Sequence, residues 1–296
     1  MLDYKLIEAL AMVAGEGGFD RAAKALCITQ SAVSQRVKLL EELTGQVLIV
    51  RTTPPRTTSA GRKILKHYLQ VKQLEQDLVG EMNAPDRQDF TPIAMGVNAD
   101  SLAFWLLEAV HSFLVEEKVL LDIRVDDQEQ THEMLKAGEV MGCISTQEQP
   151  MQGCRVEYLG CMHYRLVATS GFADKWFPGG LTLEGVQRAP ALIFDRNDAL
   201  LDKLLLQAFG TVPGAVPAHY VPSVEKYAEF ITRGHAYGSL PDQQSRALID
   251  AGQMVDLLPG RCVSATLYWH CWNLKSAVLE KLTQSLIRKA KTMLEK

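Results

Sequence analysis

Residues 22–41 read AAKALCITQSAVSQRVKLLE, and this stretch decides the fold of the N-terminal part of the chain. Its small alanines predict a short helix that approaches a second helix closely, and residues 27–28 predict the tight turn between them. Thr29 is placed to cap the second helix, in which Val33 and Val37 recur on the inner face. Two helices joined by a short turn, the second with a polar outer face, are typical of a helix-turn-helix.

The polar outer face of the second helix carries the side chains that read DNA in such a motif. Ser, Gln and Lys bond base edges and phosphates in a major groove. The alternative interpretation is an ordinary amphipathic helix with a solvated face, but the turn, the cap and the local charge agree on DNA reading. We therefore expect DNA contacts from Gln30, Ser31, Ser34, Gln35 and Lys38.

The flanking residues complete a winged head. Ahead of residue 22, glycines 15, 17 and 18 end a first helix. Residues 46–51 predict a strand and residues 52–56 a turn, which together form the wing. Arg51 and Arg56 are then expected near the DNA backbone.

Charge is distributed unevenly along the 296 residues, whose formal net charge is −4. The stretch from Asp20 to Lys66 has nine basic and three acidic side chains, so it carries +6 and the rest carries −10. A basic head on an acidic body predicts a polyanion partner at one end only.

Residues 22–41 resemble the signature of LysR-type transcriptional regulators, with paired alanines, a Thr-Gln-Ser-Ala-Val-Ser centre and a closing Leu-Glu. The family's wing is matched less closely, because Ile49 stands where the family has Phe and Thr57 where it has Leu. The Thr-x-Pro-Pro-Arg of residues 52–56 resembles the ArgP/LysG branch, also called inhibitor of chromosome initiation. The resemblance implies a promoter-binding regulator of the cytoplasm that senses basic amino acids, L-lysine or L-arginine, and works with RNA polymerase.

A long helix is expected to connect the head to the rest of the chain. From residue 59 the sequence reads helical for more than twenty residues, and residues 80–92 predict a hinge. Its apolar positions suit either a partner helix or the chain's own first helix, and we favour a homodimer, with a dimer of dimers as a further possibility. LysR-type regulators dimerise through this helix. The expected seam is Ile64, Tyr68, Val71, Leu74 and Leu78.

The residues after Pro92 alternate between strands and helices, which predicts an α/β domain. Strands are expected at residues 93–98, 119–125 and 141–145, and a second half begins near Val167. Two such lobes resemble the type 2 periplasmic-binding-protein fold that LysR-type regulators use to sense effectors. The expected domains are a winged head (1–58), a linker helix with hinge (59–89) and an effector domain (90–296). Within the effector domain, one lobe spans about 90–166 and 267–296 and the other about 167–266.

An effector is expected between the lobes, at the carboxyl ends of strands and beside helix starts. The helix start at residues 98–101 suits the carboxylate and the ammonium of an amino acid. The alternative, which the sequence favours equally, is that Asp100 or Ser101 only caps the helix. Acids at residues 126–129 suit a cationic side chain, and a solvated loop is the alternative there. The candidate residues are Asn98, Ala99, Asp100, Ser101, Asp127, Glu129, Ser145, Thr146, Phe194, Asp195, Ser223, Tyr237 and Ser239.

Other classes of protein find little support in the sequence. No catalytic or nucleotide-binding motif is present, and His132-Glu133 lacks the second His of a metalloprotease helix, so we expect a surface pair and no enzyme. The six cysteines form no C-x-x-C pair, so no metal is expected. No apolar run is long enough for a membrane span. Apart from the effector, no cofactor is expected. The alternatives to an effector-controlled regulator are an effector-independent architectural DNA protein, a LysR-type regulator with a different effector, and a solute-binding module with a vestigial head.

Overall fold

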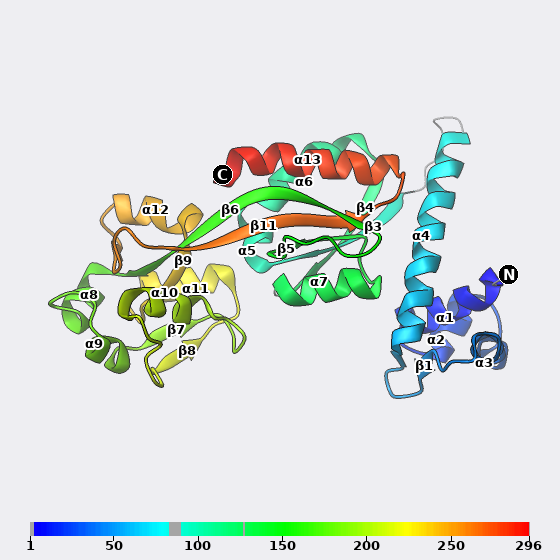
Figure 1. Ribbon diagram of the computed structural model, residues 1–296, viewed down its shortest axis with the longest axis horizontal. Helices are drawn as coiled ribbons and strands as arrows, with labels where there is room; N and C mark the ends of the chain where they lie inside the picture. Colours follow the sequence, from blue (N-terminus) through cyan, green and yellow to red (C-terminus); the bar gives the residue numbers. More distant parts are fainter. Residues whose placement is uncertain (1–2, 83–89, 127, 296) are drawn as a thin grey trace. The chain divides into compact units, whose positions relative to one another are not determined.

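The computed structural model describes residues 3–82, 90–126 and 128–295 (Figure 1). Contacts divide the chain into two compact units. The first comprises residues 1–98, 110–157 and 269–285, and the second comprises residues 99–109, 158–268 and 286–296. Within the described residues, no helix is both long and apolar enough to cross a membrane.

The head of the first unit is a winged helix-turn-helix. Helices α1 (Tyr4–Glu16), α2 (Phe19–Ala25) and α3 (Gln30–Thr44) precede strands β1 (Ile49–Val50) and β2 (Arg56–Thr57), which pair antiparallel. The first helix continues through residue 15 and ends at Gly17, which is left-handed with a φ of 66°. The expected strand at 46–51 is wrong in extent, and Arg56 belongs to a strand instead of a turn.

A short hydrogen-bonded junction joins the wing to the linker helix α4 (Ser59–Met82). The Thr58 hydroxyl donates to the Val47 carbonyl at 2.7 Å and accepts from the Gly61 N–H at 3.1 Å, so Thr58 caps α4. A Cβ at Gly61 would lie only 2.1 Å from the Leu48 carbonyl oxygen. The helix therefore approaches the wing at a distance that only glycine allows.

The linker helix packs against the head with its first half. Ile64 and Tyr68 contact the head core, and the Tyr4 ring lies 6.5 Å from that of Tyr68. These two residues are partly buried within their own chain, and their place in the expected dimer seam stays a prediction. The helix continues to Met82, beyond the expected start of the hinge, most of which lies outside the described residues.

The rest of the first unit is an α/β layer. Strands β3 (Thr91–Val97) and β4 (Val119–Val125) pair parallel along their whole length, and β5 (Gly142–Ser145) pairs parallel with β3. Helix α7 (Gln128–Ala137) packs on β5, and Gly138 after it approaches Lys66 of α4 closely. Between β3 and β4 the chain forms α5 (Ala99–Ser101), the π-helical turn η1 (Leu102–Leu106) and α6 (Leu107–Glu116).

The main sheet has the hydrogen-bonded order β10-β6-β11-β5-β3-β4, and β9 also pairs with β6. Strand β6 (Cys154–Ala168) is one long strand that the sequence analysis did not anticipate, and it ends close to the expected start of the second half near Val167. The later elements are α8 (Ser170–Trp176), α9 (Leu183–Arg188), β7 (Ala191–Ile193), α10 (Leu200–Phe209), β8 (Ala218–Tyr220), α11 (Val224–Thr232), β9 (Gly238–Pro241), α12 (Asp242–Asp250), β10 (Val255–Asp256), β11 (Val263–Trp272) and α13 (Ala277–Met293).

The close approach at Gly61 gives a test of the head. Replacing Gly61 with Ala forces the wing away from α4, and overpacking of this kind typically costs roughly 1–3 kcal/mol. Hydrogen exchange at the amides of α1 and α3 should accelerate accordingly. Gly15 is the matched control, because a Cβ there meets nothing within 4 Å inside a helix, and Gly15→Ala should protect these amides equally or better. Equal exchange in both variants would contradict the tight junction.

Candidate DNA interface and effector site

The recognition helix α3 presents the expected polar face. The Thr29 hydroxyl accepts a hydrogen bond from the Ala32 N–H at 3.2 Å, as a helix cap does. Ser34 is half-buried, whereas the other candidates are exposed: Gln30, Ser31, Gln35 and Lys38. Lys38 lies 3.6 Å from Glu42 in an exposed pair, and such pairs contribute only about 0–1 kcal/mol, so a phosphate can readily replace Glu42.

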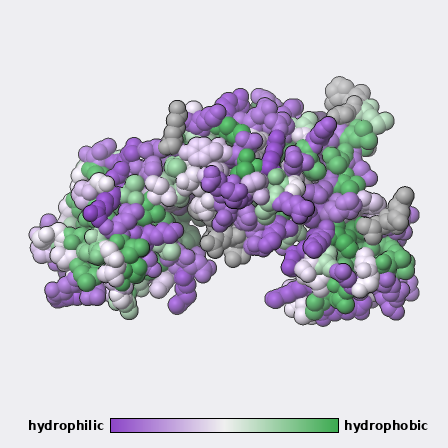
Figure 2. Space-filling view, viewed as in Figure 1, coloured by the Kyte–Doolittle hydropathy of each residue, from purple (hydrophilic) through white to green (hydrophobic). Residues whose placement is uncertain are grey.

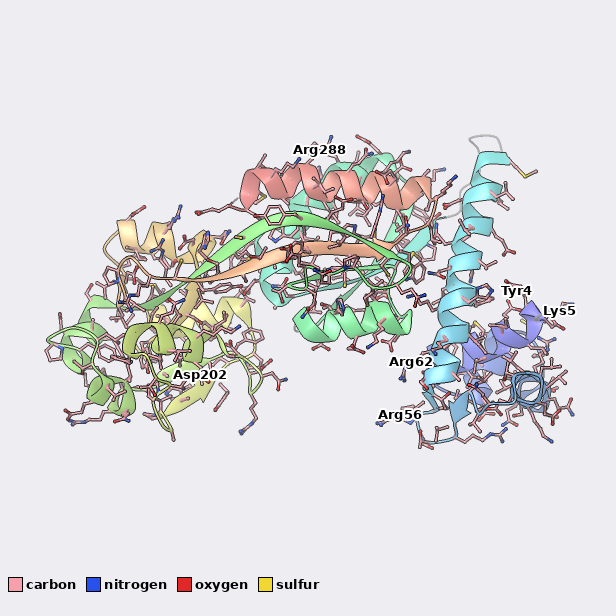
Figure 3. The ribbon with its side chains drawn as sticks, viewed as in Figure 1. Tyr4, Lys5, Arg56, Arg62, Asp202 and Arg288 are labelled. Atoms are coloured by element: carbon pink, nitrogen blue, oxygen red, sulfur yellow. The ribbon has the colours of Figure 1, made fainter. Side chains whose placement is uncertain are left out.

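The wing adds exposed cations to the head. Arg51 places its guanidinium 5.3 Å from the centre of the Phe19 ring, which holds it beside α2. Arg56 and Arg62 extend from the end of the head where β2 meets α4 (Figure 3), and Arg62 donates to the Thr57 carbonyl at 3.2 Å. The wing therefore carries cations suited to a phosphate backbone.

Glu41 has a structural role that sequence reasoning missed. Its carboxylate accepts the backbone N–H of Leu48 at 2.8 Å and of Ile49 at 3.3 Å. These bonds satisfy two backbone N–H groups at the point where the chain enters β1. The closing Leu-Glu of the signature thereby fixes the wing to the recognition helix.

At the start of α5, Asp100 is half-buried and carries a strong hydrogen bond. The Tyr164 hydroxyl donates to its carboxylate at 2.6 Å. Burial raises the pKa of Asp100, the bond from Tyr164 opposes this rise, and the nearby charge of Asp198 adds to it. Burial, and then Asp100 itself, also hold the pKa of Tyr164 well above its usual range.

Asp198 is the second carboxylate of this cluster, and the sequence argument chose Asp195 instead. Asp198 accepts the N–H of Leu200 at 2.9 Å and of Phe194 at 3.3 Å, which fixes its position ahead of α10. Asp195 accepts the N–H groups of Asn197 and Asp198, so it shapes the turn. Within the described residues, neither Asp100 nor Asp198 forms an ion pair with a Lys, Arg or His side chain.

Two further polar groups at the same helix start are buried. Asn98 ends the strand segment and is 5% exposed, and Ser101 is fully buried. Among the described residues, neither the Asn98 Oδ1 nor the Ser101 Oγ has a hydrogen-bond partner. Unsatisfied buried polar atoms are uncommon in folded proteins, and they indicate a position prepared for a polar ligand or water.

Strand β5 ends at the buried Ser145, and the half-buried Thr146 follows it. The Ser145 hydroxyl accepts the Gln147 N–H at 3.2 Å, and the Gln147 carbonyl accepts from the His270 Nε2 at 2.6 Å. The His132 ring meets the His270 ring edge-on, with 5.3 Å between centroids. His132 is therefore half-buried and not the expected surface residue. Burial lowers the pKa of both histidines.

The remaining candidates fall into structural roles or outside the described residues. Tyr237 is fully buried, and its ring meets that of Phe177 edge-on, so it belongs to the core. Ser223 caps α11, and Phe194 packs 6.4 Å from the Tyr227 ring. Ser239 is buried, and its N–H donates to the Tyr227 hydroxyl at 3.3 Å. Asp127 lies outside the described residues, as does the side chain of Glu129.

Comparisons with known proteins agree with the head's geometry. Residues 4–62 match the model of the bacterial regulatory helix-turn-helix proteins of the lysR family. The chain is 42% identical to the HTH-type transcriptional regulator ArgP of Photorhabdus laumondii, over 99% of this chain and 97% of that protein. This chain is a member of the LysR family. As such it is a DNA-binding transcriptional regulator and not an enzyme.

Solved LysR-family structures extend the likeness to the whole chain. The crystal structure of ArgP from Mycobacterium tuberculosis is 36% identical, with a TM-score of 0.90, and the match covers 100% of this chain and 99% of that one. Full-length LysG from Corynebacterium glutamicum, solved with bound effector Arg, is 30% identical, with a TM-score of 0.83 and full coverage of both chains. The expected fold, a winged head followed by an α/β effector domain, is thereby confirmed.

The recognition helix and the wing should respond differently to substitution. Gln35→Ala removes a base contact, which typically costs about 1–3 kcal/mol and relaxes sequence preference. Arg56→Ala should instead weaken binding to all sequences alike and flatten the salt dependence. Fluorescence anisotropy with a selected duplex and a scrambled duplex separates the two effects. An unchanged preference in Gln35→Ala would contradict this role of α3.

The buried histidines predict a pH dependence of stability. Because their folded pKa values lie below the usual value of about 6.5, the unfolded chain binds protons first as the pH falls. Stability should be flat above about pH 6.5 and decrease below it. His270→Gln should reduce this slope in thermal denaturation. If the stability of wild type and His270→Gln changed in parallel between pH 5 and 7, His270 would not be a source of the pH dependence.

Proposed function

We propose that this LysR-family regulator senses a basic amino acid, L-arginine or L-lysine, through Asp100 and Asp198. The observation that carries the proposal is the pair of carboxylates, whose charges raise the energy of the site while no cation of the described chain pairs with either one. A half-buried carboxylate beside a second negative charge is unfavourable, and a cationic ligand reduces that penalty. The bound Arg of the LysG structure supports the same class of effector.

The helix start at residues 99–101 supplies the complementary groups. The unpaired Ser101 hydroxyl and the free N–H groups of the first helical turn suit the carboxylate of an amino acid. Asp100 and Asp198 then hold the α-ammonium and the side-chain cation. Ser145 and Thr146, which the sequence argument also selected for the carboxylate, remain candidates.

We further propose that the regulator acts as a dimer in the cytoplasm, where it binds promoter DNA and contacts RNA polymerase. Support for the dimer comes from the second half of α4, along which Figure 2 shows hydrophobic surface. Leu74 is 41% exposed, Leu78 56% and Met82 77%, and these positions are one turn apart. A stripe of this kind is typical of a helix that packs on a partner helix.

Calorimetry on the full-length protein tests the effector. L-arginine or L-lysine should bind, and norleucine, which lacks the terminal charge, should not. Asp198→Asn should weaken binding by about 30-fold or more, because losing the partner of a buried charge costs at least about 2 kcal/mol. Asp202→Asn is the matched control, since Asp202 is exposed on α10 (Figure 3).

Two results would contradict the effector proposal. Equal affinity for norleucine would show that charge plays no part in recognition. Heat from neither basic amino acid, with DNA binding intact, would favour the effector-independent architectural protein.

Sedimentation velocity tests the dimer. Leu78→Glu places a charge in the proposed interface and should shift the protein toward monomer, because a buried unpaired charge costs several kcal/mol. Glu75 is exposed on the same helix, and Glu75→Gln should leave the dimer unchanged. A Leu78→Glu protein that sediments as the wild type does would reject this surface.

A further inference from the structure

The second unit contains a cavity that the proposed effector site does not use. Its volume is about 420 Å³, which is ample for a single-ring molecule. The side chains that give it chemical character are Phe172, Lys175, Trp176 and His235, from α8 and the segment after α11. None of the residues around Asp100 and Asp198 lines this cavity.

The lining combines aromatic faces with positive charge. The Lys175 ammonium lies 5.2 Å from the centre of the Trp176 ring, and the Phe172 ring lies 6.2 Å from that ring. Exposed His235 adds a second nitrogen base, whose ring rests 5.0 Å from Phe230. No Asp or Glu lines the cavity, and Lys175 forms no ion pair with any described residue.

We infer that this cavity binds a small aromatic carboxylate, as a second ligand site separate from the amino-acid site. A planar ring packs against the half-buried Trp176 ring, and its carboxylate accepts hydrogen bonds from Lys175 and His235. The ammonium that already lies over the Trp176 ring keeps its cation–π contact while it pairs with the ligand's charge. An aliphatic acid loses the stacking, and a neutral aromatic loses the charge pairing.

A substitution at Gly171 can block ligand binding to the cavity without disturbing the core. Gly171 lines the cavity, and a Cβ there meets nothing within 4 Å, so a larger side chain enters open space. Gly179 is equally unobstructed and lies outside the cavity. Gly171→Leu therefore fills the site, and Gly179→Leu is its matched control.

Calorimetry and thermal shift on the full-length protein use benzoate as the probe. Cyclohexanecarboxylate, with the same charge, and benzyl alcohol, with the same ring, are the controls. Benzoate should bind saturably with a Kd of about 1 mM or below. Lys175→Met should weaken it about tenfold, Gly171→Leu should abolish it, and Gly179→Leu should leave it unchanged.

Titration of each variant with L-arginine or L-lysine keeps this test independent of the proposed effector, because no lining residue contributes to that site. Saturable benzoate binding that Gly171→Leu abolishes and Gly179→Leu preserves supports the inference. Absence of saturation, equal binding of either control compound, or full binding by Gly171→Leu overturns it, whatever the response to basic amino acids.

Discussion

The placement of Asp100 beside Asp198, without a cation of the described chain, is the constraint that organises the effector part of this regulator. Burial and the nearby charge of Asp198 both raise the pKa of Asp100, and the hydrogen bond from Tyr164 opposes this rise. Several elements hold the arrangement in place, including the hydroxyl of Tyr164 on β6 and the backbone N–H groups ahead of α10. In the proposed function, a cationic ligand lowers the energy of this negative site, which links ligand binding to the chemistry of basic amino acids.

The DNA-binding head is held together differently, by close packing of one backbone segment against another. Glu41 fixes the wing to the recognition helix, and Gly61 allows the linker helix to approach the Leu48 carbonyl. Because Ile64 and Tyr68 of the same helix complete the head core, movement of α4 carries the wing with it. Linker helix, wing and recognition helix therefore form one continuously packed part of the chain.

The sequence predicted the head well because its helices are short, periodic and capped by local residues such as Thr29. It failed where a role depends on three-dimensional neighbours. Ile64 and Tyr68 also contact the head core of their own chain, and helical spacing alone does not reveal that contact. Strand β6 was missed because half-buried and charged residues interrupt its hydrophobic alternation. Asp195 and Asp198 lie in one turn, and only hydrogen bonds to backbone N–H groups show that Asp195 shapes the turn while Asp198 adds its charge to that of Asp100.

The most direct test of the account measures DNA affinity as a function of effector. A duplex selected from random sequence is titrated with the full-length protein, in anisotropy experiments with and without L-arginine or L-lysine. The account predicts that one of the two amino acids changes DNA affinity about fivefold or more, in either direction, with a midpoint equal to its calorimetric Kd. It also predicts that Asp100→Asn shifts this midpoint to higher concentration. DNA affinity that is the same at all concentrations of both amino acids would contradict it.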